Sequence, residues 1–291
     1  MTDWFSTTRR NARSVQTTIG WIFWDPGATR RYVELGLPEQ FAEPLGYIAS
    51  RCAPLAAAGP DAVIAAFGSI SPLGIRATFD LVGPPARFED FRRARDEAVV
   101  EGLREHAPSI VAPLVELGPL LWPVVEQLPT MGRVLYGAHL ALERPDDPLL
   151  SGWHAVNCIR EWRGDTHWAL AVAAGLDHAE ASILHNAWMG YETDWLARSR
   201  GTDPAAIDAG WVELEAKGLA SDDRTVRTEG VALRQRLEDD TDRLTIRPWE
   251  LLGEVRSGWF ADTFEPPCEQ LLRRVDLTAG PNYQPASRLR P

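Results

Sequence analysis

Helix-forming segments, separated by glycine and proline turns, follow one another along almost the whole of the 291-residue chain. The signals are clearest late in the chain, where Asp203 is an N-cap residue and Pro204 stands in the first helical turn. Only 220–228 has the turn and β-forming residues of a hairpin. The sequence therefore predicts a mainly α protein. The expected helices are 29–37, 39–54, 60–67, 73–81, 88–106, 108–121, 123–142, 150–174, 179–189, 193–200, 205–217, 228–244 and a short one from 259 onward.

The net charge of the chain argues against nucleic acid as a partner. Thirty basic residues oppose forty-one acidic ones, a net charge of −11, so the surface as a whole repels a phosphate backbone. The three widely spaced cysteines, Cys52, Cys158 and Cys268, predict neither a disulfide framework nor a zinc site. No run approaches the ~18 uninterrupted apolar residues of a membrane span, and the N-terminus lacks an export signal. We expect a cytoplasmic protein with no metal, no cofactor and no membrane partner.

From 193 to 244 the predicted order is helix, short turn, helix, hairpin, helix, which is the order of a winged helix-turn-helix domain. Leu-Glu-Ala-Lys-Gly-Leu at 214–219 leads into the hairpin, and Thr-Glu-Gly at 228–230 opens the last helix. This segment, about a quarter of the chain, resembles the DNA-binding domain of the multiple-antibiotic-resistance (MarR) class of regulators. The resemblance implies that 204–217 is the recognition helix.

A polar, turn-rich stretch at 143–148 marks the main division of the chain. A length of 291 residues fits two domains, and a hydrophobic content of 45% is ample to form buried cores. We therefore expect a helical N-terminal lobe over 1–147 and the winged helix-turn-helix domain over 148–255. A C-terminal helix with a flexible tail is expected over 256–291.

A longer signature lies in the longest predicted helix, where Trp-His-Ala at 153–155 precedes Arg-Glu-Trp-Arg-Gly-Asp-Thr-His at 160–167. It is similar to the signature of an actinobacterial helix-turn-helix family. Further matches run from Glu-Leu-Gly-Leu at 34–37 to Pro-Trp at 248–249, so the resemblance spans nearly the whole chain. It implies a two-lobed helical protein and leaves open whether the first lobe is a degenerate copy of the second. Where that family often carries an N-terminal histidine, this chain has the apolar run 19–24, so no role of that histidine carries over.

The predicted recognition helix lacks the composition of a DNA reader. Its start offers Asp203 and Asp208, where major-groove readers place basic or amide side chains. If DNA is bound, the phosphate contacts are expected from arginines of the preceding helix and the hairpin, namely Arg198, Arg200, Arg224 and Arg227. The fold alone does not establish DNA binding.

Twelve tryptophans are an unusual number for this chain. Buried indole rings are large and flat, and each needs a partner for its N–H group. The tryptophans either fill a core or line an aromatic pocket for a flat ligand. For a pocket between the lobes we expect Trp21, Phe23, Trp24, His154, Arg160, Trp162 and Trp188.

The helix 150–174 carries the densest chemistry. Its helical spacing places His154, Asn157, Glu161 and Asp165 near one face and Arg160, Arg163 and His167 near another. The first face could hold a divalent metal or do acid–base work, although the spacing differs from the His-Glu-x-x-His zinc helix. The arginines could clamp a carboxylate, or all these charges could form a buried structural network. Gly164 costs ~1 kcal/mol in a helix interior, which suggests close approach of another helix or a ligand.

Three functions follow from these observations. The preferred one is a non-catalytic protein that senses or sequesters a hydrophobic or aromatic compound, such as a secondary metabolite, between two lobes. The second is a ligand-responsive DNA-binding regulator, which a homodimer with its arginines on one plane would favour. The third is an enzyme that reuses the scaffold with a polar centre made of His154, Glu161, Asp165 and His167.

Overall fold

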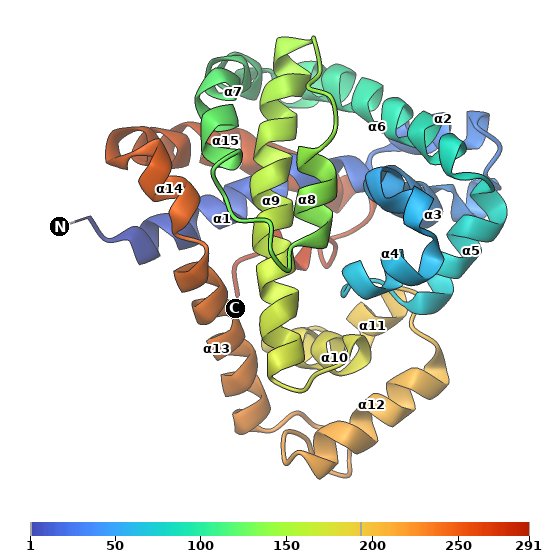
Figure 1. The fold of residues 1–291 in the computed structure, drawn as a ribbon. Coiled ribbons are helices and arrows are strands. Elements are labelled where there is room, and N and C mark those ends of the chain that lie inside the picture. Colours follow the sequence, from blue (N-terminus) through green and yellow to red (C-terminus); the bar gives the residue numbers. More distant parts are fainter. Residues whose placement is uncertain (1, 193, 291) are drawn as a thin grey trace.

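The computed structural model describes residues 2–192 and 194–290, and it is built almost entirely of helices (Figure 1). Residues 1, 193 and 291 lie outside the described residues. All three belong to the predicted domains, and residue 193 also belongs to the helix expected at 193–200. The mainly α fold is confirmed. The α-helices are α1 (Trp4–Gly20), α2 (Pro26–Glu34), α3 (Glu39–Cys52), α4 (Pro60–Ala66), α5 (Pro72–Val82), α6 (Pro85–His106), α7 (Val111–Val125), α8 (Val134–Leu140), α9 (Pro148–Ala173), α10 (His178–Trp188), α11 (Trp195–Ser199), α12 (Pro204–Ala216), α13 (Thr228–Leu244), α14 (Arg247–Leu252) and α15 (Glu254–Thr278). Short 3₁₀ helices join them: η1 (Trp21–Trp24), η2 (Ala53–Ala58), η3 (Pro108–Ile110) and η4 (Pro285–Ser287).

The larger lobe is organised around α9, which packs against α7, α8 and α1. Its apolar core joins residues 15–162 to 249–275, so that α15 returns from the end of the chain to lie along α1 (Figure 1). Glycines set the crossing of α7 and α9, because a Cβ atom on Gly152 would lie 2.0 Å from the carbonyl oxygen of Leu114.

Helices α10 to α13 form a smaller lobe with a core of its own, in the lower part of Figure 1. Its helices begin where the sequence predicts: Asp177 forms a capping box with Glu180 at α10, and Asp203 caps α12 ahead of Pro204. The buried residues of this second core are Leu176, Ile183, Leu184, Ala197, Ile207, Trp211, Leu214, Ala220 and Leu237. The two cores make the molecule two-lobed, and α9 joins them, because Leu170 near its end packs on the smaller core.

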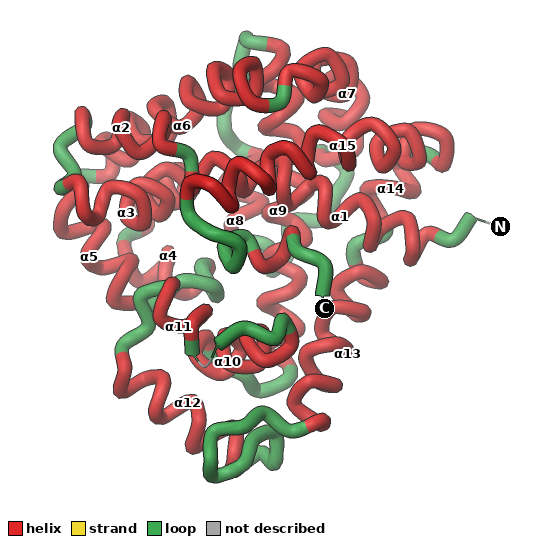
Figure 2. Tube along the Cα trace, turned by 180° about the vertical axis from the view of Figure 1, so that it is seen from behind, coloured by secondary structure: helices red, strands yellow, loops and turns green. Residues whose placement is uncertain are grey.

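The predicted hairpin is reduced to one antiparallel bridge between Ala220 and Val226. Helices and loops account for the rest of the described chain (Figure 2). The turn passes through Arg224, whose φ of 60° is left-handed, and the Arg224 side chain forms an ion pair with Asp208 of α12 at 2.6 Å. The hairpin expected as a wing is therefore a tight turn between α12 and α13 with a single β-bridge.

One helical segment, Pro108–Val125, is long and apolar enough to cross a membrane. It contains α7, and its side chains at Leu114, Leu117 and Leu121 are fully buried in the core of the larger lobe. Burial against α9 explains its apolar character as that of a core helix. It also runs through Pro123, where the sequence suggested the start of a new helix.

Several helices differ from the sequence predictions: α1 and α14 were not predicted, α15 is longer than expected, and the helix expected at 123–142 is divided between the end of α7 and α8. Helix α1 was not predicted, because it buries polar side chains such as Thr8, Asn11 and Ser14 and so lacks an apolar stripe. Helix α15 spans 25 residues and continues through Pro266 and Pro267, where only a short helix was expected.

The segment after α15 folds back onto α1 and does not extend away as the expected flexible tail would. The Nε atom of Arg13 donates to the carbonyl oxygen of Ser287 at 2.8 Å, and Arg288 Nε donates to that of Tyr283 at 2.9 Å. Gln284 is buried between this segment and Gly20. The C-terminal segment thus contributes to the region between the lobes.

Candidate ligand-binding cleft

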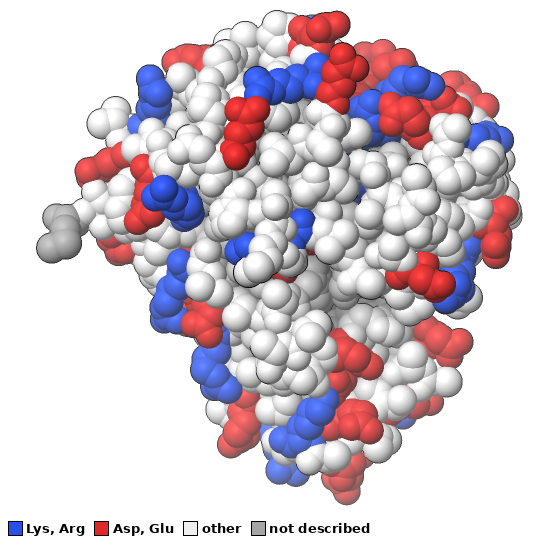
Figure 3. Space-filling model, viewed as in Figure 1, with Lys and Arg blue, Asp and Glu red and all other residues white. Residues whose placement is uncertain are grey.

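A cleft of ≈ 700 Å³ separates the two lobes, and Figure 3 shows the surface hollowed there among largely uncharged side chains. We call it the interlobe cleft. Its walls come from η1, α3 and α5 of the larger lobe, α10, α11 and α13 of the smaller lobe, the second half of α9 and the C-terminal segment. The apolar lining residues include Phe23, Trp24, Ile48, Ile70, Leu73, Ala77, Leu81, Trp168, Trp195 and Leu196.

Two sets of contacts hold the lobes together around the cleft. Ser71, the N-cap of α5, donates its hydroxyl to the carbonyl oxygen of Gly201 at 2.6 Å. A chain of aromatic rings links Trp24 to Tyr283, with centroids 4.5 Å apart, and Tyr283 to Trp195 at 5.1 Å. A hydrogen bond and a row of aromatic rings therefore connect the two lobes at the edges of the cleft.

A buried ion-pair network forms the back of the cleft. Glu161 accepts hydrogen bonds from Arg51 at 2.7 and 2.9 Å and from Arg160 at 2.7 Å. Burial alone would raise the pKa of Glu161, but the two guanidinium groups outweigh burial and hold that pKa well below its usual range. The hydroxyl of Tyr47 accepts a further hydrogen bond from Arg51 at 2.7 Å. Two arginines thus share one carboxylate, which leaves one positive charge at this wall.

A second network lies on α13. Glu238 accepts hydrogen bonds from Arg163 at 2.5 Å and from Arg234 at 2.8 Å, and Asp242 accepts one from Arg163 at 2.7 Å. The Arg234 guanidinium also lies 4.6 Å from the ring centre of Trp188. Here the acidic groups match the arginines, so this network adds little net charge.

Arg200, at the end of α11, differs from the other arginines of the cleft. Its side chain donates to the hydroxyl of Ser182 at 3.2 Å, and within the described residues no carboxylate lies within ion-pair distance of it. Burial, reinforced by the charges of Arg234 and Arg51, lowers the pKa of Arg200 to about 10. Arg200 remains a cation at neutral pH and faces the cleft without a counter-ion.

Several buried polar atoms at the cleft have no hydrogen-bond partner among the described residues: Arg163 Nε, Arg234 Nη1, His185 Nε2 and Gln284 Nε2. Such atoms are uncommon in folded proteins and usually have a specific explanation. The imidazoles are neutral, because burial and then Arg234 lower the pKa of His167 to about 3 and that of His185 well below its usual range. The atoms on Arg163, Arg234 and Gln284 are N–H donors, so the cleft presents buried donors without acceptors among the described residues.

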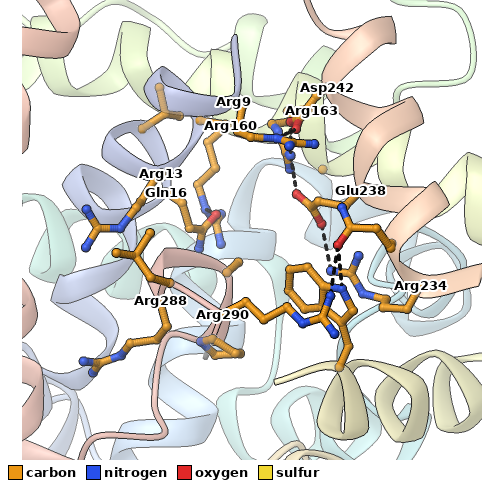
Figure 4. Close-up of a pocket in the computed structure, with 18 residues that line it drawn as sticks. Arg9, Arg13, Gln16, Arg160, Arg163, Arg234, Glu238, Asp242, Arg288 and Arg290 are labelled. Atoms are coloured by element: carbon orange, nitrogen blue, oxygen red, sulfur yellow. Dashed lines mark hydrogen bonds and ion pairs between the residues drawn. The ribbon is translucent and has the colours of Figure 1, made fainter. Parts of the chain in front are cut away.

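A smaller pocket of ≈ 300 Å³ adjoins the interlobe cleft and shares Arg160, Arg163, Gly164 and Arg234 with it. We call it the arginine pocket. Figure 4 shows arginines from α1, α9, α13 and the C-terminal segment around it, with the heads of Arg13 and Arg288 directed away from the other side chains; Glu238 and Asp242 are the acidic residues among its lining. Its arginines are Arg9, Arg13, Arg160, Arg163, Arg234, Arg288 and Arg290. Six of these seven arginines, all except Arg290, form ion pairs with described carboxylates, so the pocket is rich in arginine but carries little unpaired charge.

The structure brings together part of the expected ligand set. Phe23, Trp24 and Arg160 line the interlobe cleft, and Trp188 lines the arginine pocket. The remaining three lie in the interior, away from the lining. Trp21 packs on Gly102, His154 packs edge-on to Trp122, and the N–H group of Trp162 donates to the carbonyl oxygen of Pro129.

The residues considered for an enzyme do not form one centre. Glu161 is occupied by its arginines, and Asp165 accepts from the backbone N–H of Tyr136 at 2.9 Å on the side facing α8. His154 is buried beside His139, with a pKa lowered by burial to about 4. Only His167 lines the cleft, where its Nδ1 atom lies 2.9 Å from the hydroxyl of Thr241. No three His, Cys, Asp or Glu side chains of the described chain are grouped to hold a metal ion.

The four arginines considered for DNA also separate. Arg200 lines the cleft and Arg224 is paired with Asp208, while Arg198 and Arg227 are exposed. The exposed face of α12 carries acidic side chains, Asp208, Glu213 and Glu215. Lys217 at the end of this helix is held by Glu180. The helix that would enter a DNA groove thus presents an acidic surface.

Sequence reasoning missed Tyr47, Arg51, Trp168 and Arg234 as lining residues. Tyr47 and Arg51 lie one helical turn apart, within a stretch that carries the family resemblance, and this spacing was the available signal. Trp168 follows the signature directly, and it packs so closely on Gly68 that a Cβ atom there would lie 2.4 Å from the ring. The sequence carries no signal for Arg234, because an arginine four residues before a glutamate is typical of the solvent-exposed face of a helix.

A family model described as a helix-turn-helix family matches residues 8–278. Neither the curated proteins nor the solved structures include a match to this chain. Because the family model covers almost the whole chain, the chain belongs to this helix-turn-helix family.

Proposed function

We propose that this helix-turn-helix protein binds a small, largely apolar molecule in the interlobe cleft, and that binding rather than catalysis is its activity. The observation that carries the proposal is the cleft itself, ≈ 700 Å³ of space with aromatic walls and a few buried polar groups. Ligand sites of proteins have this character, with volumes of about 300–1,000 Å³, and they occur preferentially between domains. The ligand would be a flat hydrophobic or aromatic compound that the protein senses or sequesters.

The position of the cleft suits a sensor. A ligand between the lobes touches α5 through Leu73 and α11 through Leu196, and both flank the Ser71–Gly201 contact between the lobes. Such a ligand interacts differently with different lobe arrangements, and this difference is what shifts a conformational equilibrium.

The test is equilibrium binding to the full chain, followed by intrinsic fluorescence, because Trp24, Trp168 and Trp195 line the cleft. We expect saturable quenching by at least one of two flat probes, 2-naphthol and 2-naphthoate. Ala77→Phe fills the cleft and should weaken binding at least tenfold, whereas Ala209→Phe on the exposed face of α12 should not change it. Unsaturable quenching by both probes, or equal affinity of Ala77→Phe and wild type, would contradict the proposal.

Family membership favours a second candidate, a ligand-responsive DNA-binding regulator of MarR-like architecture. Fluorescence anisotropy with labelled genomic fragments at low and at physiological salt distinguishes the two, because non-specific duplex binding falls steeply with salt. The acidic face of α12 predicts no binding even at low salt. Salt-sensitive binding that is weakened by Arg227→Gln would place the regulator first. A homodimer, which such a regulator would need for a two-fold operator, stays a prediction.

A further inference from the structure

We propose that the ligand of the interlobe cleft is an organic acid, whose carboxylate pairs with Arg200 while its flat apolar body lies against Phe23 and Trp168. This inference rests on the proposed function and specifies the chemistry of its ligand. It is carried by the charges, the unpartnered donors and the wall composition of the cleft.

The cationic side chains around the cleft exceed their acidic partners. Glu161 is shared by Arg51 and Arg160, which leaves one positive charge, and Arg200 adds a second. The arginines of the α13 network are balanced by Glu238, Asp242 and Asp239, through ion pairs with Arg163, Arg234 and Arg9. The excess is thus divided between the Glu161 network and Arg200.

One further carboxyl group lines the cleft without belonging to these networks. Glu43 on α3 forms no ion pair with any described arginine, and burial raises the pKa of its carboxyl group. Because no ion pair joins the two side chains, Glu43 is not the counter-ion of Arg200. The cation at Arg200 is left to a charge from outside the chain.

The unpartnered donors support the same ligand chemistry. Arg234 is 4% exposed and His185 is 7% exposed, yet the Nη1 donor of Arg234 and the Nε2 atom of the neutral His185 ring lack hydrogen-bond partners among the described residues. Both residues line the same cleft as Arg200, and the positive charges of Arg234 and Arg200 act on His185. A carboxylate supplies about four acceptor positions, so it can satisfy such donors together with a guanidinium group.

The walls argue for an anion with an apolar body. Most of the lining is apolar or aromatic, with Phe23 and Trp168 among it, and one arginine lacks a counter-ion. A polyphosphate ligand would be expected at a glycine-rich loop that precedes a helix, and the sequence contains no such loop. An aromatic or alicyclic carboxylic acid fits both the charge and the walls.

The experiment compares two probes that differ in charge but share one ring system, 2-naphthoate and 2-naphthamide, by calorimetric titration of the full chain at pH 7.5. We expect 2-naphthoate to bind at least tenfold more tightly than the amide. In Arg200→Gln this preference should fall to within about twofold, because the affinity for naphthoate drops and that for the amide does not. The matched control is Arg227→Gln, an exposed arginine of the same lobe, which should keep the preference of wild type.

The outcomes separate this inference from the proposed function. Equal binding of acid and amide by the wild-type protein overturns the organic-acid inference but leaves a ligand-binding cleft. If neither probe binds at millimolar concentration, both fail. A preference for the acid that survives in Arg200→Gln also overturns the assignment of the carboxylate to Arg200.

Thermal denaturation supplies a second readout. Arg200 is repelled by Arg51 and Arg234, so Arg200→Gln should melt at or above the wild-type temperature when no probe is present. It should also lose most of the increase in melting temperature that 2-naphthoate gives the wild-type protein. A variant that melts several degrees below wild type and still gains the full stabilisation from naphthoate would show that Arg200 is structural.

Discussion

The two halves of α9 have different surroundings. The first half lies in the core of the larger lobe, where Trp153 and Val156 are fully buried and Gly152 touches the backbone of α7. The second half carries Arg160 and His167 into the interlobe cleft. One continuous helix therefore fixes the site to a rigid core, as a precise binding site requires.

The largest effect is expected at the boundary between the two halves. Glu161→Gln removes the charge that neutralises Arg51 and Arg160, and breaking a buried ion pair costs about 3–5 kcal/mol. Urea denaturation at pH 7 should show this loss, whereas Glu126→Gln, at an exposed pair with Arg144, should change stability by less than about 0.5 kcal/mol. Equal stabilities of the two variants would mean that the network between α3 and α9 does not stabilise the fold.

The same pair has a defined pH dependence. The pKa of Glu161 in the folded protein lies below its value in the unfolded chain, so its contribution is present above the unfolded pKa of about 4.5. That contribution is lost as the pH falls below this value. Glu161→Gln should therefore flatten the loss of stability between about pH 5 and pH 2 in denaturation curves.

The first half of α9 should not tolerate even a methyl group. Gly152→Ala places a Cβ atom 2.0 Å from the carbonyl oxygen of Leu114, a backbone atom that can move only if α7 moves. We expect a loss of about 3 kcal/mol in the free energy of unfolding, measured in urea. A loss below about 1 kcal/mol would contradict the close helix crossing.

Asp165, on the face of α9 that points to α8, should make the stability of the protein depend on pH. Burial raises the pKa of its carboxyl group to about 7, above the unfolded value, so its contribution to stability is full below about pH 4 and is lost as the pH rises to about 7. Asp165→Asn keeps an acceptor for the N–H of Tyr136 and should gain on the order of 2 kcal/mol at pH 8 but nothing at pH 4. A gain that is independent of pH would contradict the raised pKa.

The smallest effect is expected in the second half, at Gly164. The nearest atom to a Cβ there is Glu161 Oε2 at 4.0 Å, so Gly164→Ala meets only ordinary contact distances. The variant should gain about 0.5–1 kcal/mol from helix propensity, measured in the same urea series as Gly152→Ala. A loss of stability would mean that another element packs on Gly164, as in the first half of the helix.

The local features of the fold could be predicted from sequence because they depend on short-range chemistry. Asp177 and Asp203 mark helix starts through their own side chains, and Gly175 and Gly218 end helices with positive φ. Helix α1 could not be predicted in this way, since its buried face is polar and is satisfied by contacts with distant segments. The amide of Asn11, for example, donates to the carbonyl oxygen of Ser257.

The candidate site was predictable only in part, for a similar reason. The helical spacing correctly separates Asp165, which faces α8, from Arg163, which faces α13. However, the partner of Glu161 is Arg51, 110 residues earlier in the chain, and no spacing reveals such a pair. Arg200 was considered for DNA because the sequence shows that it follows a helix but not that it faces a cleft.

The most direct test of the central claim, that the interlobe cleft is a small-molecule site, is a crystal structure of the full chain with 2-naphthoate. We expect the ring to lie between Phe23 and Trp168 and the carboxylate to lie within hydrogen-bond distance of the Arg200 guanidinium group. A probe bound elsewhere on the molecule, with the cleft free of it at saturating concentration, would contradict the account.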